Sequence, residues 1–421
     1  MALNRNSLSS FSTNARAASL LPSLDYSLLA RLFLLLFLGL ADNQMIAALL
    51  PALVRSLHVS VGKAGILVVV YSLGAGVAAF LSGKLSDHYG RRRFLLAGVI
   101  IFSLASALAF RAQSFGGLLA ARALTGLGAG TLSTCSIAFA GDWFPYAVRG
   151  RAIGLISTAY FAAPILGVPL AAQVADRFGW RHSFLMFALL GLAVTLISLT
   201  IPREARNQES VPARLAGTIR VFQAFLARRD TSAALVIAFL VSGGLVGFLT
   251  YLGQWLHSHF GISTRGIGWV FMLGGLVAVA GSPLGGILSD RLGKRTVALA
   301  SNVVLALAIA VVPFFSWGVW LLILFCIASL STAFRQGPLT ALITELVSQH
   351  QRGLFVALHN IASQLGIALA VLAGGLLYER YGYFAVTTLC ATMTGLVAIL
   401  LATHIVEPPP EGDATSDRYF Y

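Results

Sequence analysis

Long apolar stretches alternate with short polar segments along the whole chain. They lie at about 28–54, 64–82, 94–111, 115–140, 151–174, 183–201, 232–256, 266–285, 296–313, 317–343, 353–377 and 384–405. Each stretch is long enough to cross the hydrocarbon core of a bilayer as a helix. An open chain can satisfy its backbone groups in lipid only as helices. The pattern therefore predicts an all-α membrane protein with twelve transmembrane helices.

One polar segment is longer than the others and divides the apolar stretches six and six. It covers 203–230, is rich in arginine and contains no lysine. We interpret it as a cytosolic linker between an N-terminal six-helix bundle (28–202) and a C-terminal six-helix bundle (231–406). Residues 1–27 are predicted to form an uncleaved tail because they lack the apolar core and cleavage site of a signal peptide, although a transit peptide remains an alternative. The composition of residues 407–421 predicts a disordered cytosolic tail.

The distribution of basic residues predicts the orientation in the membrane. With the N-terminus in the cytosol, clusters such as Arg91-Arg92-Arg93 and Arg228-Arg229 lie on the cytosolic side. Far fewer basic residues fall on the other side: Arg55, Lys63, Arg111, Arg177, Arg181, Arg265 and Arg380. Loops that retain positive charge stay in the cytosol. Both termini are therefore predicted to be cytosolic.

The composition excludes several other classes of protein. Of the chain, 57% is hydrophobic and only 10% is charged, too little charge to cover the surface of a soluble domain. The net charge of +14 is compatible with nucleic-acid binding, but the charges lie in short clusters between apolar stretches, so we expect a lipid bilayer and no nucleic acid as the partner. The three cysteines have neither disulfide nor metal-ligand spacing, and no metal is expected. Without a Walker loop or a nucleophile elbow, we expect no enzyme, no ATP hydrolysis and no cofactor.

The two halves of the chain repeat each other at a constant offset of 203 residues. Gly83-Lys84-Leu85-Ser86-Asp87-His88-Tyr89-Gly90-Arg91-Arg92 aligns with Gly286-Ile287-Leu288-Ser289-Asp290-Arg291-Leu292-Gly293-Lys294-Arg295. The same offset relates Asp142 to Glu345, Arg149-Gly150 to Arg352-Gly353, and Asp176-Arg177-Phe178-Gly179 to Glu379-Arg380-Tyr381-Gly382. The duplication predicts two pseudo-symmetric halves with a substrate cavity between them near the membrane midplane.

The repeated loop resembles the signature loop of the major facilitator superfamily, and the resemblance extends over roughly residues 28–405. Arg122 with Gly126, Gly128 and Gly130 is similar to that superfamily's Arg-x-x-x-Gly-x-Gly motif in helix four. The resemblance implies a secondary transporter that works by alternating access. A monomer is expected because one chain holds both halves of the cavity.

Helix five resembles the Gly-Pro-x-x-Gly motif of the antiporters in that superfamily at Pro164 and Gly167, followed by Pro169. It departs from the motif because Ala163 stands where the first glycine is usual. The Gly-Val-Pro-Leu run and the later Gly179-Trp180-Arg181 look more like the sugar- and nucleoside-efflux permeases of the drug–proton antiporter group. The resemblance implies efflux, multidrug or sugar-like substrates, and the inner membrane of a bacterium, although an organelle is not excluded.

The signature loop is expected to act as a conformational latch on the cytosolic face. Gly83 and Gly90 permit a tight turn, and Asp87 can accept hydrogen bonds from a helix N-terminus, which the family implies is that of helix eleven near Gly353. Arg91 would then bridge Asp87 and Asp142. The alternative is that the arginines only hold the loop in the cytosol. The second copy of the loop contributes Gly286, Asp290, Gly293 and Arg295.

Three charged residues lie well inside the apolar stretches: Asp42, Arg122 and Arg335. Charge within a span is costly, which makes each a functional candidate. Asp42 is the deepest carboxylate and our candidate for the coupling proton site, because its proton affinity would change as Arg122 approaches and leaves. The alternative is a fixed Asp42–Arg122 ion pair between helices one and four. His359 is a second candidate proton carrier.

Polar and aromatic side chains within the apolar stretches are candidates for the substrate cavity. They are Gln44, Tyr160, Tyr251, Gln254, Arg335, Gln336, Asn360 and Gln364. If Arg335 faces the cavity, it would favour an anionic or polar substrate. The alternatives are pairing of Arg335 with backbone carbonyls or loop acids, and interhelical hydrogen bonds for the others.

These residues predict export of small organic molecules by proton antiport, with the proton gradient as the energy source. The alternative is a proton symporter or uniporter that imports a sugar, a nucleoside or an organic anion.

Overall fold

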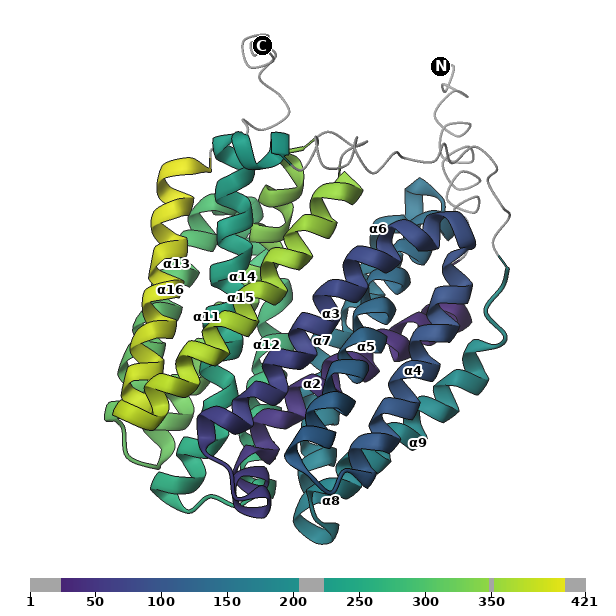
Figure 1. Ribbon diagram of the computed structural model, residues 1–421. Coiled ribbons are helices and arrows are strands. Elements are labelled where there is room, and N and C mark those ends of the chain that lie inside the picture. The colour runs from purple at the N-terminus through teal and green to yellow at the C-terminus, as the bar shows by residue number, and fades with distance from the viewer. Residues whose placement is uncertain (1–23, 204–222, 348–351, 406–421) are drawn as a thin grey trace, which may run out of the picture.

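The computed structural model describes residues 24–203, 223–347 and 352–405, and these residues are helical almost throughout (Figure 1). The first half contains α2 (Tyr26–Leu57), α3 (Val61–Tyr89), α4 (Arg91–Arg111), α5 (Phe115–Trp143), α6 (Tyr146–Ser157), α7 (Ala159–Ala162), the π-helix η1 (Ala163–Gly167), α8 (Val168–Phe178) and α9 (Trp180–Ser198). The second half contains α11 (Arg229–Phe260), α12 (Thr264–Leu292), α13 (Lys294–Val311), the 3-10 turn η2 (Val312–Phe314), α14 (Val319–Glu345), α15 (Arg352–Tyr381) and α16 (Tyr383–His404).

Twelve helices in the described residues are long and apolar enough to cross a membrane. The segments α6, α7, η1 and α8 together form the fifth of these spans, from Tyr146 to Phe178. The predicted all-α fold of twelve spans is therefore confirmed. We call the end of the bundle at which α2 begins and α16 ends the inner end, and the opposite end the outer end. Most of the predicted tails and linker falls on residues 1–23, 204–222 and 406–421, outside the described residues, as do the side chains of Glu345 and Arg352.

The duplication extends to the bounds and caps of the helices. Helices α2 and α11 begin and end at positions 203 residues apart, and so do α3 and α12. Ser60 caps α3 by accepting a hydrogen bond from the Lys63 amide, and Ser263 caps α12 in the same way. The residues whose φ lies between about 20° and 160° form three pairs with this offset in the described chain: His58 and Gly261, Gly90 and Gly293, Gly179 and Gly382. The two halves therefore share their turns as well as their helices.

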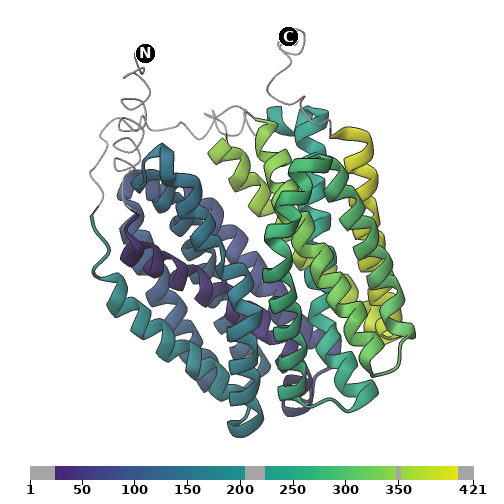
Figure 2. The same ribbon diagram turned by 180° about the vertical axis from the view of Figure 1, so that it is seen from behind.

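Each half is a six-helix bundle, and both bundles are visible side by side in Figures 1 and 2. In the N-terminal half, α5 packs against α3 and α4, and α9 covers α4. In the C-terminal half, α14 packs against α12 and α13, and α16 covers α13 and α11. The halves meet mainly through three pairings: α2 with α11, α3 with α15, and α8 and η1 with α12. Predicted pseudo-symmetry between two six-helix bundles is therefore present in the packing.

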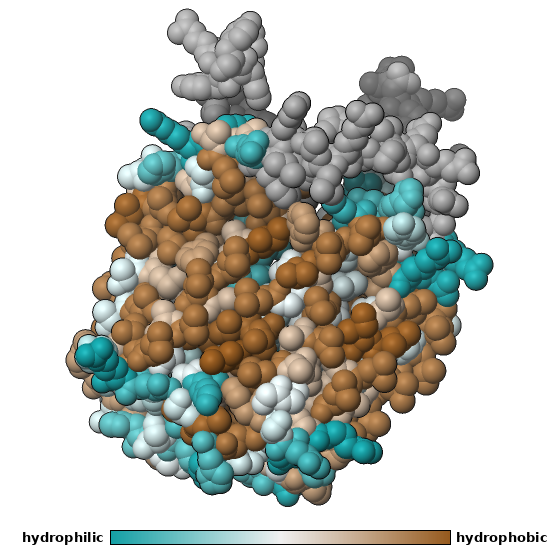
Figure 3. All heavy atoms as spheres, in the orientation of Figure 1, coloured by the Kyte–Doolittle hydropathy of each residue, from teal (hydrophilic) through white to brown (hydrophobic). Residues whose placement is uncertain are grey.

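The outer surface of the bundle is apolar over its middle. Figure 3 shows a broad hydrophobic band with hydrophilic residues gathered toward both ends. Large apolar side chains such as Leu104, Leu192, Leu307 and Leu376 are more than half exposed. Lipid acyl chains are the natural solvent for such a surface. The chain is a multi-pass integral membrane protein.

The fifth span is the most irregular part of the fold. Pro164 and Pro169 lack the amide hydrogen that a regular α-helix needs, and the turn from Ala163 to Gly167 widens to a π-helix. Single π-helical turns inside helices are frequent at functional sites. The sequence motif that resembles the antiporter signature therefore coincides with a local break in the helix.

Candidate functional site

Asp42 and Arg122 form an ion pair in the interior of the N-terminal half. Asp42 lies on α2 and Arg122 on α5, and the Nη1 of Arg122 donates a hydrogen bond to Oδ2 of Asp42. Both side chains are completely buried. The structure thus brings together two of the three intramembrane charges that the sequence singled out, and they meet within one half of the molecule.

Aromatic rings enclose this pair. The Cζ of Arg122 lies 4.5 Å from the ring centroid of Tyr71 on α3 and 5.9 Å from that of Phe184 on α9. The Tyr71 hydroxyl donates to the Gly39 carbonyl at 2.7 Å, which fixes the ring over the guanidinium. A ring face attracts a cation more strongly when water is excluded. Four helices therefore hold the pair in place.

The ion pair leaves part of its hydrogen-bonding capacity unused. Oδ1 of Asp42 and both Nε and Nη2 of Arg122 are buried without a hydrogen-bond partner among the described residues. Buried charges normally have all their polar atoms bonded, because an unpaired one is expensive in a low dielectric. Within the described residues, this buried ion pair is therefore only partly satisfied.

The η1 turn lies directly beside this site. Gly167 packs against Ala41, the residue before Asp42, so closely that a side chain there would overlap the Ala41 methyl group. On its other side, Pro164 and Ile165 of η1 face Gly275 on α12 of the C-terminal half. The antiporter-like segment therefore connects the helix of Asp42 to the opposite half of the molecule.

Arg335 has a different environment from the one expected for a residue of the cavity wall. It is completely buried on α14, and its Nη1 donates to Oδ1 of Asn302 on α13 at 3.0 Å. Its Nε and Nη2 have no hydrogen-bond partner among the described residues. The observed partner is thus a side-chain amide, and neither a backbone carbonyl nor a loop acid. Asn302 was not among the predicted site residues, although an asparagine in the apolar stretch 296–313 is a visible signal.

The remaining cavity candidates differ in exposure. Tyr160 is 49% exposed although it lies within the fifth span, and Gln336 on α14 is exposed as well. Three others are half-buried, Gln44, Asn360 and Gln364, and so is His359, the second candidate proton carrier. Gln364 lies where α15 crosses α3 at Gly76. Polar side chains that stay accessible inside a span favour a water-filled path over a lipid-facing surface.

Tyr251 and Gln254 lie elsewhere, in the contact between the halves. Tyr251 is completely buried, its hydroxyl donates to the Val371 carbonyl at 2.7 Å, and its ring tip lies against Gly65 of the N-terminal half. Gln254 is also buried, next to Gly253, which packs against the Ala47 carbonyl. In this conformation the Tyr251 hydroxyl is occupied by the protein itself.

The two halves are closed against each other at the outer end. The Gly62 amide of α3 donates to Oε1 of Glu379 on α15 at 2.9 Å. A Cβ on Gly62 would come within 2.9 Å of the Gly375 carbonyl oxygen, so the two backbones touch. We call this group, Gly62, Gly65, Tyr251, Gly375 and Glu379, the outer seal. The sequence analysis had placed Glu379 only as the repeat of Asp176.

The signature loop forms the arrangement of charges that its sequence suggested. Arg91 bonds to Asp87 at 2.6 Å, to Asp142 through Nε, and to the Ser86 hydroxyl at 3.1 Å. Gly90 has a φ of 94°, a conformation that glycine adopts without strain. Arg91 therefore joins the inner ends of α3 and α5.

The second basic residue of each copy of the loop, Arg92 or Arg295, contacts backbone carbonyls at a helix end. Arg295 donates to the carbonyls of Leu401 and Ala402 at the end of α16. Its repeat in the first half, Arg92, donates to the Leu199 carbonyl after α9 at 2.8 Å, and Leu199 is the repeat of Ala402. Gly286, Asp290 and Gly293 occupy the same turn as their repeats, with a φ of 90° at Gly293. Cations at these positions stabilise the C-terminal ends of helices.

Comparison with known proteins agrees with this architecture. The sequence model of the Major Facilitator Superfamily matches residues 32–264 and 234–418. An uncharacterised transporter of that type from Bacillus subtilis, YwfA, is 30% identical over 86% of this chain and 87% of its own length. The inner membrane transport protein YdhP of Escherichia coli K12 is 28% identical over 86% and 92%. A hexuronate transporter from Bacillus subtilis is 26% identical over 63% and 64%.

Among solved structures, the crystal structure of a D-xylose–proton symporter superposes with a TM-score of 0.77 over 91% of this chain and 99% of that one, at 16% sequence identity. At this level of identity the match concerns the fold alone. The fold, the duplicated signature loop and the matched sequence model agree over both halves. This chain belongs to the major facilitator superfamily and is a membrane transporter.

Proposed function

We propose that this transporter exports small organic molecules, drug-like or sugar- and nucleoside-like, in exchange for protons. The observation that carries the proposal is the buried Asp42–Arg122 pair, in which one carboxylate oxygen and two guanidinium nitrogens have no hydrogen-bond partner among the described residues. It is a proton-binding group placed deep inside a transporter fold. No cofactor is needed, because the proton gradient supplies the energy.

Protonation of Asp42 would change the balance between conformations. A neutral Asp42 no longer compensates the charge of Arg122, and an uncompensated buried charge destabilises its surroundings strongly. Tyr71 can hold part of that charge through its ring face, at 4.5 Å. Helices α2 and α5 would then rearrange until Arg122 finds other acceptors. Proton binding is converted in this way into movement of the N-terminal half.

The η1 turn supports exchange as the mode of transport. It lies between the helix of Asp42 and α12, through Gly167 on one side and Gly275 on the other. A rearrangement around Asp42 would therefore be transmitted through the η1 turn to the contact between the halves. The resemblance of Pro164, Gly167 and Pro169 to the antiporter motif favours export. His359, half-buried on α15, is the second candidate proton carrier.

The substrate path is proposed to run between the halves from the inner end. Tyr160, Gln336, Asn360 and Gln364 would supply its polar contacts, with Gln44 at its deepest point. The outer seal would close this path in the conformation described here, and Arg91 with Asp87 and Asp142 would latch the inner end in the opposite conformation. We place the inner end in the cytosol, because that end carries most of the basic residues. A bacterial inner membrane is the proposed location, as the name of YdhP states for that relative.

The alternative function is import of a sugar, a nucleoside or an organic anion by symport or uniport. Two observations favour it. The relative named as a hexuronate transporter acts, by its name, on an organic anion. The fifth span also departs from the antiporter motif at Ala163.

Proton flux in proteoliposomes tests the proposal. A pH-sensitive dye is enclosed in the vesicles, and a panel of lipophilic dyes, sugars, nucleosides and organic anions is added to the wild type, Asp42→Asn and Asp176→Asn. Asp176 is an exposed acid at the outer end and serves as the matched control. We expect substrate-dependent proton flux in the wild type and the control, and none in Asp42→Asn.

Exchange of labelled for unlabelled substrate separates coupling from folding. Asp42→Asn should keep this exchange, because it requires alternating access and no net proton movement. Proton flux in Asp42→Asn equal to that of the wild type would remove Asp42 from the mechanism. Protons that move in the same direction as the substrate would establish the importing alternative.

A further inference from the structure

A pocket of about 690 Å³ opens between the inner ends of α11 and α16, away from the transport path. Its walls include Arg229, Ser232 and Val236 from α11, and Leu400, Thr403 and His404 from α16. Arg229 is the first residue of α11 and His404 the last residue of α16, so the rim of the pocket lies where a bilayer has its headgroups. Val236 lies seven residues further along α11, about 10 Å deeper at the α-helical rise.

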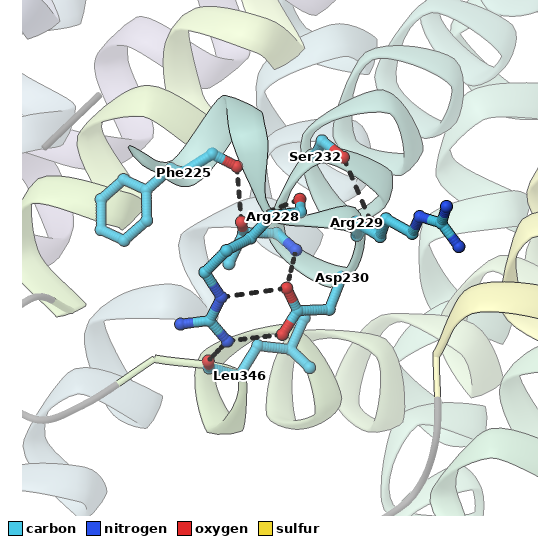
Figure 4. Close-up of polar contacts among 7 residues, drawn as sticks. Phe225, Arg228, Arg229, Asp230, Ser232 and Leu346 are labelled. Atoms are coloured by element: carbon cyan, nitrogen blue, oxygen red, sulfur yellow. Dashed lines mark hydrogen bonds and ion pairs between the residues drawn. The ribbon is translucent and has the colours of Figure 1, made fainter. Parts of the chain in front are cut away.

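In this pocket one arginine forms an ion pair, whereas the next arginine along the chain forms none within the described residues. Arg228 binds Asp230 through two hydrogen bonds of 3.2 and 2.6 Å, and Asp230 also accepts the Thr231 amide at 2.8 Å (Figure 4). The negative charge of Asp230 is therefore neutralised. Arg229 points away from this pair in Figure 4, and its guanidinium has no hydrogen-bond or ion-pair partner in the part of the chain that the structure describes. One positive charge is left at the rim.

The pseudo-symmetric position in the N-terminal half is closed by a side chain. There Arg31 of α2 donates to the Thr200 carbonyl after α9 at 2.9 Å and to the Ser27 hydroxyl at 2.5 Å. The offset of 203 residues relates Arg31 to Ala234 and Thr200 to Thr403. Ala234 is completely buried and cannot reach across to α16. The same site is thus bridged by the protein in one half and open in the other.

The pocket is charged at its rim and apolar further into the membrane. The guanidinium lies at the rim, while Val236, 47% exposed, and Leu400 form an apolar surface further into the span. Basic pockets between transmembrane helices at a membrane surface suit anionic lipid headgroups. A soluble anion would leave the apolar part of this surface uncovered.

We propose that this pocket binds an anionic phospholipid, with its phosphate on Arg229 and an acyl chain along Val236 and Leu400. The lipid would take the place that Arg31 fills in the other half and would connect α11 to the end of α16. In the C-terminal half this contact between helices would be made by a lipid, whereas in the N-terminal half it is made by Arg31.

Native mass spectrometry of the full-length transporter in detergent tests this proposal. The first bound phosphatidylglycerol is titrated against phosphatidylcholine with the same acyl chains, in the wild type, Arg229→Ala, Ser232→Phe and Arg151→Ala. Ser232→Phe fills the pocket without removing a charge. Arg151 is an exposed arginine near the inner end of α6, outside the pocket, and serves as the control.

We expect the wild type to prefer phosphatidylglycerol, and Arg229→Ala to bind it about fivefold more weakly, since one basic side chain at a membrane surface contributes about that factor. Ser232→Phe should also bind it more weakly, because the ring fills the space that the lipid would occupy. Arg151→Ala should bind it like the wild type. Equal affinity in the wild type and both pocket variants would overturn the proposal. So would competition by millimolar glycerol phosphate as effective as that by the lipid, which would identify a site for soluble anions. Identical charge-state distributions and retained substrate exchange would show that the variants are folded.

Discussion

The hydrogen bond from Gly62 to Glu379 connects the two halves at the outer end, and its removal should shift the conformational equilibrium. Gly62 is the second residue of α3, so its amide is one of those that a helix leaves without an internal partner. Glu379 supplies the acceptor at 2.9 Å, and its negative charge also suits the positive end of the helix dipole. Because this bond exists only while the outer end is closed, it stabilises that conformation selectively.

The size of the effect follows from the exposure of the bond. A hydrogen bond to a charged group contributes about 1.5–3 kcal/mol when buried, and solvent screening at an exposed position reduces it to about 1 kcal/mol. Glu379→Ala should therefore raise the population that is open at the outer end about fivefold relative to the closed one. Glu379→Gln keeps an acceptor without the charge, and we expect a smaller rise of about twofold.

Distance measurements between spin labels can read these populations. The labels are attached at Lys63 and Arg380, both exposed at the outer end, after the three native cysteines have been replaced. Asp176→Ala is the matched control, because Asp176 is the repeat of Glu379 and holds no hydrogen bond to the described part of the C-terminal half. Unchanged distance distributions in Glu379→Ala, or an equal change in the control, would refute the reasoning.

Other substitutions test the inner end and the helix contacts. Arg91→Ala removes the cation that joins two carboxylates, so transport should fall and spin labels at the inner end should move apart. Arg91→Lys should restore neither transport nor the label distance, because a lysine ammonium lacks the planar, forked donors of a guanidinium. Asn302→Leu leaves the buried Arg335 without its hydrogen bond and should cost about 1–3 kcal/mol of stability in thermal unfolding. Adding Arg335→Met should recover most of that loss, and an additive result would contradict the pairing. Gly126→Ala would overlap the Tyr71 backbone and should lower the unfolding temperature, whereas Gly141→Ala, with open space around it, should leave it unchanged or raise it.

The fold was accessible from the sequence because lipid imposes a strict pattern. Apolar stretches of fixed minimum length predicted every span, and the constant offset of 203 residues predicted the pairing of the halves. The bounds were less accurate: the first stretch ended at about 54, whereas α2 continues to Leu57. Helix ends extend into the polar segments because turns and caps such as Ser60, and not hydropathy, determine where a helix ends.

Contacts between side chains were harder to predict, since they depend on how each helix is rotated about its axis. The Asp42–Arg122 pair could be anticipated, because two opposite charges deep in apolar stretches have few other partners. Arg335 has no carboxylate partner among the described residues, and sequence spacing alone did not show that its side chain points toward α13 and Asn302. Tyr251 likewise was expected to face the substrate but lies in the outer seal. The period of a helix predicts which residues lie next to each other on that helix, whereas these contacts join different helices.

The outer seal includes a main-chain contact, since Gly62 and Gly375 meet backbone to backbone. A closure of that kind does not depend on which side chains line the rest of the path. Substitutions at Tyr160, Gln336 or Gln364, which line the proposed substrate path, are therefore expected to change the accepted solute while this main-chain contact stays in place. Descendants of one ancestral transporter could in this way acquire new substrates step by step while each intermediate kept its outer end closed to ions.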